Sequence, residues 1–306
     1  NPATGKAYAQ FAASNDADVM QAIEGAQRAF AEWSRTDLRR RFRLLTRIAD
    51  IIEQETDKFA RAESIDTGKP LSMSQSFDVP WSQSNFRFFA SSILHQQSQA
   101  YHQGREAVHY TMRQPLGVVA CFGNYGMPLY SLTRRIAPAL AAGNCVIAKP
   151  AEQTPATAHL LAKACLQAGL PPGVLHIIQG EDAKVRPPLL EHKAVRAIAY
   201  DGSTAVGKEI IRSIAPQFKK LRLDLGSKNA NIIFGDCDVN QMMIHTLRSS
   251  FSNNGQLNTC CPRILVERSY YEEFKKELVK RTSFLQVGDP FSAVTDLGAW
   301  ISKKQL

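Results

Sequence analysis

The sequence predicts an α/β protein built on a Rossmann-type parallel sheet whose two faces are both covered by helices. Short apolar runs, among them residues 117–121, 144–149 and 174–178, have the length and composition of buried strands. Amphipathic segments of helical length separate these runs. Strands that alternate with helices form βαβ crossovers, which join parallel strands and place the helices on the faces of the sheet.

Helices are expected before the sheet begins. Residues 16–34 carry apolar side chains at three- and four-residue spacing, which is typical of an amphipathic helix. Asn15 or Asp16 can cap this helix by accepting from the N–H groups of its first turn. Two more helices are expected at 37–56 and 77–97, with a break between them at 66–70, where a glycine and a proline end the helical pattern.

From about residue 108, short strands alternate with helices. The expected elements are strand 108–112, strand 117–121, helix 128–142, strand 144–149, helix 154–169, strand 174–178, helix 183–191, strand 196–200, helix 203–214, strands 220–225 and 231–234, helix 238–253, strand 264–267 and helix 269–284. One of these helices has a predicted cap, because Thr154 can accept from its first N–H groups and Pro155 suits its first turn.

Composition excludes several classes of protein. The net charge is +9, but many arginines lie together in the helix at 37–56, and no nucleic-acid-binding motif accompanies them, so we expect no nucleic-acid partner. No apolar run approaches the ~20 residues of a membrane span. The six cysteines form no CxxC pair and several lie in apolar runs, which favours free thiols and a cytoplasmic protein. His95, His102 and His109 recur every seven residues, but no cysteine or carboxylate completes a metal-ligand set with them, so no metal is expected.

Two turns are candidates for holding a nucleotide, because ligands of doubly wound sheets bind at the carboxyl ends of the strands. The GxGxxG fingerprint is absent. One turn instead carries Lys149 and Glu152, which can hold ribose hydroxyls. A later turn carries Gly202, Ser203 and Val206 at the start of a helix, whose free N–H groups can face a pyrophosphate.

Taken together, the segments resemble the aldehyde dehydrogenase family along essentially the whole chain. The matching stretches are residues 1–6, 66–70, 136–155, 202–207, 224–228, 251–256, 263–267 and 287–290. Residues 85–90 and the central helices are most similar to the branch that oxidises 2-aminomuconate or related muconic semialdehydes. The resemblance implies a nicotinamide-binding domain over residues 1–225, a partial catalytic domain over residues 226–306, and an oligomer formed through strand exchange.

The resemblance also implies NAD as the cofactor. Lys149 and Glu152 match the family's adenosine-ribose positions, and Gly202 and Ser203 match its pyrophosphate turn. Asp201 replaces the usual threonine, and its charge would repel a pyrophosphate unless the side chain points away. The family continues well beyond Leu306, so we expect either a partial sequence or a truncated protein, with apolar surface that a partner or the missing part would cover.

The family's reaction needs a thiolate, a donor for the oxyanion, and a carboxylate that activates water. By the resemblance, Gly126 stands in the place of the oxyanion asparagine, Asp224 in that of the general-base glutamate, and Asn258 in that of the nucleophilic cysteine. An amide cannot form the thiohemiacetal. Cys260 lies two residues later and could act only if this segment slipped, so it is the fallback nucleophile.

These substitutions predict a catalytically inactive family member with a structural, scaffolding or assembly role. Two alternatives stay open. One is an NAD-dependent semialdehyde dehydrogenase that uses Cys260, and the other is a sensor that binds NAD without turnover.

Overall fold

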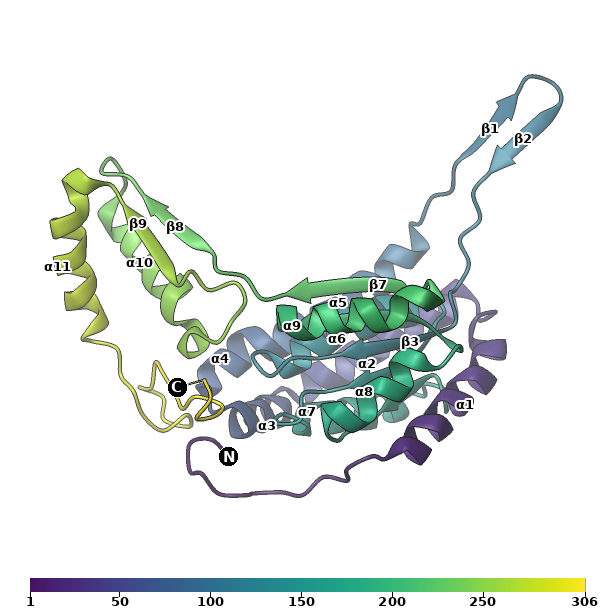
Figure 1. The fold of residues 1–306 in the computed structure, drawn as a ribbon, viewed down its shortest axis with the longest axis horizontal. Helices are drawn as coiled ribbons and strands as arrows, with labels where there is room; N and C mark the ends of the chain where they lie inside the picture. Colours follow the sequence, from purple (N-terminus) through teal and green to yellow (C-terminus); the bar gives the residue numbers. More distant parts are fainter. Residues whose placement is uncertain (306) are drawn as a thin grey trace.

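The structure, a computed structural model, describes residues 1–305 (Figure 1). Along the chain, the elements are α1 (Asp16–Trp33), α2 (Leu38–Gln54), α3 (Thr56–Thr67), α4 (Leu71–Met73), the π-helical turn η1 (Ser74–Asp78), α5 (Val79–Leu94), β1 (Ala100–Gln103), β2 (Ala107–Tyr110), β3 (Val118–Phe122), α6 (Pro128–Ala141), β4 (Cys145–Lys149), α7 (Ala156–Gln167), β5 (Leu175–Ile177), α8 (Asp182–Glu191), β6 (Val195–Gly202), α9 (Thr204–Ile214), η2 (Ala215–Gln217), β7 (Lys220–Leu225), β8 (Ala230–Ile233), α10 (Val239–Phe251), η3 (Ser252–Gly255), β9 (Arg263–Val266), η4 (Arg268–Tyr270) and α11 (Tyr271–Thr282).

A five-stranded parallel sheet with the order β5-β4-β3-β6-β7 forms the centre of the molecule, and helices flank it (Figure 1). Every residue of β3 and β4 is buried, which explains why their sequences are continuous apolar runs. The chain builds outward from β3 on one side and then returns to build β6 and β7 on the other. This reversal places a topological switch point between β3 and β6, where doubly wound sheets bind their ligands.

The predicted helices before the sheet are confirmed. Asn15 caps α1 in a capping box, in which its side chain accepts from the N–H of Asp18 at 3.1 Å and the Asp18 carboxylate accepts in return at 2.9 Å. Asp37 caps α2 by accepting from the N–H groups of Arg39 and Arg40. The predicted break is the end of an additional helix, α3, where Gly68 adopts the left-handed conformation with φ of 77°.

The predicted cap of α7 is wrong. This helix begins at Ala156, with Pro155 at the N-cap position, and no side chain next to it in sequence accepts from its first turn. The Thr154 hydroxyl is buried and has no partner among the described residues. The N–H of Ala156 donates instead to the Asp66 carboxylate at 2.8 Å. The cap therefore comes from the end of α3, which tertiary packing brings alongside.

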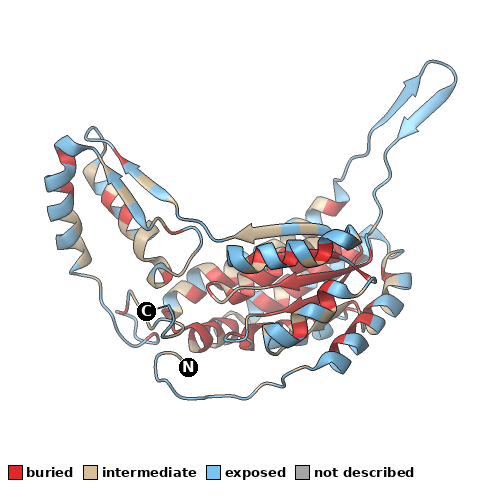
Figure 2. Cartoon of the chain, in the orientation of Figure 1, coloured by how far each residue is buried: buried red, intermediate tan, exposed pale blue. Residues whose placement is uncertain are grey.

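Two strands lie outside the main sheet. β2, which contains most of the predicted strand 108–112, pairs with β1 in an antiparallel hairpin that projects from the body and is exposed throughout (Figure 2). β8 does not extend the main sheet, because it pairs in parallel with β9. That small unit has its own core of four buried side chains, Ile233, Met243, Tyr270 and Phe274.

The small unit also exposes apolar surface, as the sequence led us to expect. Ile232, Phe234, Leu265 and Val279 are all more than half exposed. Among the described residues, no helix combines the length and the apolar composition that crossing a membrane requires.

Candidate functional site

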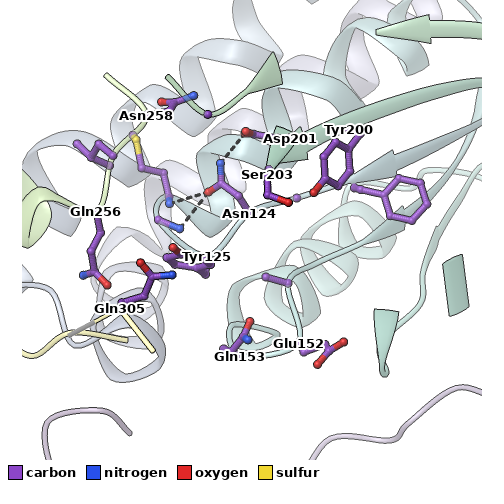
Figure 3. A pocket seen from close by; sticks show the side chains of 18 of the residues that line it. Asn124, Tyr125, Glu152, Gln153, Tyr200, Asp201, Ser203, Gln256, Asn258 and Gln305 are labelled. Atoms are coloured by element: carbon purple, nitrogen blue, oxygen red, sulfur yellow. Dashed lines mark hydrogen bonds between the residues drawn. The ribbon is translucent and has the colours of Figure 1, made fainter. Parts of the chain in front are cut away.

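A cleft of about 520 Å³ opens at the switch point of the main sheet. Its lining comes from the ends of β3, β4 and β6 with the residues that follow them, the start of α8, the residue after β7, the end of η3 with the segment after it, and residues 304–305. The residues are Phe122, Gly123, Asn124, Tyr125, Gly126, Met127, Lys149, Ala151, Glu152, Gln153, Asp182, Tyr200, Asp201, Gly202, Ser203, Gly226, Gly255, Gln256, Leu257, Asn258, Lys304 and Gln305. Figure 3 shows Glu152 and Tyr200 toward one end of this cleft and Gln256 and Asn258 toward the other.

The predicted ribose pair lies at the first end of the cleft. Lys149 ends β4, and its side chain is almost wholly buried. Its ammonium donates to the carbonyl of Pro150 at 3.1 Å and forms an ion pair with Asp182. Glu152 accepts from the main-chain N–H of the same Asp182. Sequence reasoning missed Asp182, because it belongs to neither predicted turn and begins a different helix.

The predicted pyrophosphate turn is formed where β6 meets α9. Ser203 caps α9 by accepting from the N–H of Val206 at 3.3 Å, and Gly202 and Ser203 both line the cleft. Val206 is not in the lining, and its N–H serves the cap. A Cβ at position 202 would meet the hydroxyl of Tyr200, so a side chain there would force the Tyr200 ring to move.

The charge of Asp201 is directed away from this turn and is compensated. Its carboxylate accepts from the side-chain amide of Asn124 at 2.6 Å and pairs with the guanidinium of Arg135 at 3.2 Å (Figure 3). Both members of the ion pair are nearly buried, and burial lowers the pKa of Arg135 while the Asp201 charge raises it. The repulsion of a pyrophosphate that the sequence suggested is therefore offset by a paired cation.

Gly126, at the oxyanion position, offers only its main chain. Its N–H donates to the Asn124 side chain at 3.0 Å, and its carbonyl accepts from Lys69 at 2.9 Å and from Asn253 at 2.8 Å. A Cβ atom at this position would lie 2.5 Å from the carbonyl oxygen of Gln256. The segment after η3 thus packs directly against Gly126, where a larger residue does not fit without a shift of the main chain.

A buried charge cluster lies behind Gly126. The Lys69 ammonium pairs with Asp78 at 2.8 Å and with Glu63 at 3.5 Å, and all three side chains are fully buried. Burial raises the pKa of Glu63 to about 8, because one ammonium cannot compensate two carboxylates in a dry interior. Sequence reasoning had a signal for this cluster in the matched segment 66–70, but it did not assign a role to Lys69.

The raised pKa of Glu63 predicts that stability falls as pH rises. The unfolded chain loses this proton near pH 4.5 and the folded chain near pH 8, so the folded state binds more protons between these values. We expect the free energy of unfolding to drop by on the order of 3 kcal/mol from pH 5.5 to pH 9. Urea unfolding across this range measures the slope. Glu63→Gln should flatten it, and equal slopes in both proteins would contradict the assignment.

Asp224, at the general-base position, is held by two arginines. It forms an ion pair with Arg134, and Arg135 lies 3.7 Å away. Asp224 does not line the cleft, and its other carboxylate oxygen accepts from the side chain of Asn258 at 3.4 Å. The carbonyl of Asn258 accepts from Ser227 at 2.8 Å. The side chains at the base and nucleophile positions therefore contact each other, and the charge of Asp224 is paired with arginines.

Cys260, the fallback nucleophile, faces a different cavity. It lines a space of about 780 Å³ that includes Cys261 and His245, and it is absent from the cleft that holds Asn258. Its thiol donates to the carbonyl of Ser252 at 3.6 Å, and burial raises its pKa. Nucleophilic cysteines typically combine a lowered pKa with access, whereas the Cys260 thiol is buried and its pKa is raised.

The chain was compared with known proteins. The model of the aldehyde dehydrogenase family matches residues 1–306. The 2-aminomuconic semialdehyde dehydrogenase of Homo sapiens is 43% identical over all of this chain and 63% of its own length. The 5-carboxymethyl-2-hydroxymuconate semialdehyde dehydrogenase of Escherichia coli is 35% identical over 99% of this chain and 64% of its own length. The chain thus spans somewhat less than two thirds of these curated relatives.

Solved structures agree with this assignment. An aldehyde dehydrogenase of Brucella melitensis biovar abortus is similar with a TM-score of 0.97 and 30% identity, over 99% of this chain and 63% of that one. The betaine aldehyde dehydrogenase of Staphylococcus aureus in complex with NAD⁺ is similar with a TM-score of 0.96 and 30% identity, over 99% of this chain and 61% of that one. With the doubly wound sheet, the cleft at its switch point and a family match over its full length, this chain belongs to the aldehyde dehydrogenase family.

Proposed function

We propose that this chain binds an NAD-type dinucleotide in the cleft and does not carry out thiol-dependent aldehyde oxidation there. One observation carries the proposal: the residues suited to the adenosine and pyrophosphate end line the same cleft as an amide, Asn258, at the nucleophile position. The donor set fits such a ligand. The Glu152 carboxylate, next to Lys149, can accept from ribose hydroxyls, and the N-terminus of α9 behind Ser203 favours a phosphate.

Two of the three chemical roles of the reaction lack their functional group, and the third is held by a shorter side chain. Asn258 has no thiolate to add to an aldehyde carbon, and Gly126 offers no side-chain amide to an oxyanion. Removing one oxyanion donor typically costs about 10²–10³ in rate. Asp224 keeps a carboxylate, but it pairs with Arg134 and Arg135 and does not line the cleft.

A second candidate function is turnover through Cys260. It is favoured by the relatives, which are named as semialdehyde dehydrogenases, and their substrate class would be the first to try. The position of Cys260 in the other cavity counts against it. The structural or scaffolding role that the substitutions suggested gains no support from the names of the relatives, so it stands third.

A paired measurement separates these functions. Calorimetric titration with NAD is expected to give saturable binding, while NADH formation with a panel of aldehydes and semialdehydes stays at the level of the protein-free control. Turnover that Cys260→Ser abolishes would establish the second candidate instead. Absence of NAD binding at millimolar concentration would overturn the proposal and leave the structural role.

We further propose a domain boundary at 225/226 and an oligomeric assembly. The main core includes side chains up to Leu225, and the next buried cluster starts at Ile233. The exposed β1–β2 hairpin carries Tyr101 and Tyr110, each more than 60% exposed, which suits an interface with another copy. Sedimentation of the protein with and without residues 100–110 would test the assembly.

A further inference from the structure

Asp182 contacts both Lys149 and Glu152, the two residues that the sequence assigns to the ribose. Its carboxylate forms an ion pair with the Lys149 ammonium, and its main-chain N–H donates to Glu152. As the first residue of α8, Asp182 also stabilises that helix through its dipole. The helix explains an acidic residue at this place, but it does not explain why the side chain reaches across to Lys149, 33 positions earlier in the sequence.

The groups that remain available to a ligand at this end are carboxylate oxygens. The side chain of Lys149 is 2% exposed, whereas that of Asp182 is 43% exposed and lines the cleft beside Glu152. Arg186 does not supply a cation to the ligand at this end. Its guanidinium lies 3.5 Å from Asp182 and 3.4 Å from Glu209, and it does not line the cleft. The lining at this end therefore has one cation, already paired, and two carboxylates.

Carboxylates accept hydrogen bonds and repel anions, so this end distinguishes two kinds of ribose. A ribose with free hydroxyls can donate to Asp182 and Glu152. A 2′-phosphorylated ribose has lost the proton of its 2′-oxygen, and it brings close to two negative charges next to two carboxylates. The pairing of Lys149 with Asp182 also removes the one cation that could otherwise receive such a phosphate.

We propose that Asp182 is a specificity-determining residue, which selects a dinucleotide with an unmodified adenosine ribose and rejects its 2′-phosphorylated counterpart. This rests on the proposed function, since it concerns the same cleft. Asp182 acts through its own carboxylate and by holding the ammonium of Lys149.

The test is the ratio of the dissociation constants for NADP and NAD, measured by calorimetry on the whole chain. We expect the wild type to bind NAD at least about tenfold more tightly, a difference of ~1.4 kcal/mol. Asp182→Asn keeps the shape and removes the charge, and it should reduce this ratio about tenfold or more. Glu181→Gln is the matched control, because Glu181 is the neighbouring acid, pairs with Lys184 at 3.1 Å and lies outside the cleft lining. It should leave the ratio within about twofold, because an exposed charge is screened by solvent.

The same ratio can be followed without any substitution. If the rejection is electrostatic, raising the salt concentration should narrow the ratio in the wild type. ADP-ribose and its 2′-phosphate should give the same ratio, which locates the effect at the adenosine end. Equal wild-type affinities for NAD and NADP, or an unchanged ratio in Asp182→Asn, would overturn this inference and leave dinucleotide binding intact. Failure of the wild type to bind either dinucleotide would overturn the proposed function itself and this inference with it.

Discussion

Lys69→Met is expected to lower the free energy of unfolding by about 3–5 kcal/mol, the usual result of removing one partner from a buried ion pair. Lys69 is the only lysine or arginine within 4 Å of Asp78 and Glu63 among the described residues, and all three side chains are fully buried. Without the ammonium, Asp78 would keep a carboxylate oxygen that already has no partner and lose the partner of the other. It would have to take up a proton, so the loss should be smaller at low pH.

Urea unfolding of the wild type and the variant measures this effect. Lys58→Met is the matched control, because it makes the same substitution in a pair, Lys58–Glu55 at 2.7 Å, that is open to solvent. That control should change stability by no more than about 0.5 kcal/mol. If the free energy of unfolding falls by similar amounts in the two variants, the buried ion pair contributes no more to stability than the exposed one, and the prediction is wrong.

Gly126→Asn, which would return the family's amide to the oxyanion position, is expected to destabilise the protein rather than repair it. The new Cβ would lie 2.5 Å from the main-chain oxygen of Gln256, and a main-chain atom cannot rotate away as a side chain can. Overpacking of this kind costs about 1–3 kcal/mol. Relief requires the segment that carries Asn258 to move. Hydrogen exchange in residues 255–258 should therefore accelerate in the variant.

Gly226→Ala provides the comparison for this substitution. Gly226 also lines the cleft, but a Cβ there meets nothing within 4 Å. The melting temperature of the Gly226→Ala variant should therefore stay close to that of the wild type. A Gly126→Asn variant as stable as Gly226→Ala would show that residues 255–258 adapt freely, and the substituted site could then be rebuilt one residue at a time.

Patterns that repeat along the chain predicted most of the fold. Buried strands such as β3 and β4 are apolar throughout because both of their faces are covered, and this leaves a signal in the sequence. The cap of α1 was predictable too, since Asn15 bonds to an N–H only three residues away. The cap of α7 was not, because Asp66 supplies it from 90 positions away.

The candidate site also has a part that the sequence predicts and a part that only the tertiary structure shows. The turns with Lys149 and Ser203 follow predicted strands, so their convergence at one edge of the sheet could be expected. The contacts that decide their chemistry could not, because they depend on tertiary packing: Asp182 reaches Lys149, Arg135 compensates Asp201, and Gln256 closes on position 126. Sequence identifies which residues were replaced, but only their neighbours in space show what each replacement now touches.

The two walls of the cleft belong to units of unequal size. Lys149 and Ser203 stand at the ends of strands in the main core, whereas Asn258 lies between α10 and β9, in a unit whose buried core is four side chains. A ligand in this cleft would therefore contact both units at once, with Lys149 and Ser203 on one side and Asn258 on the other.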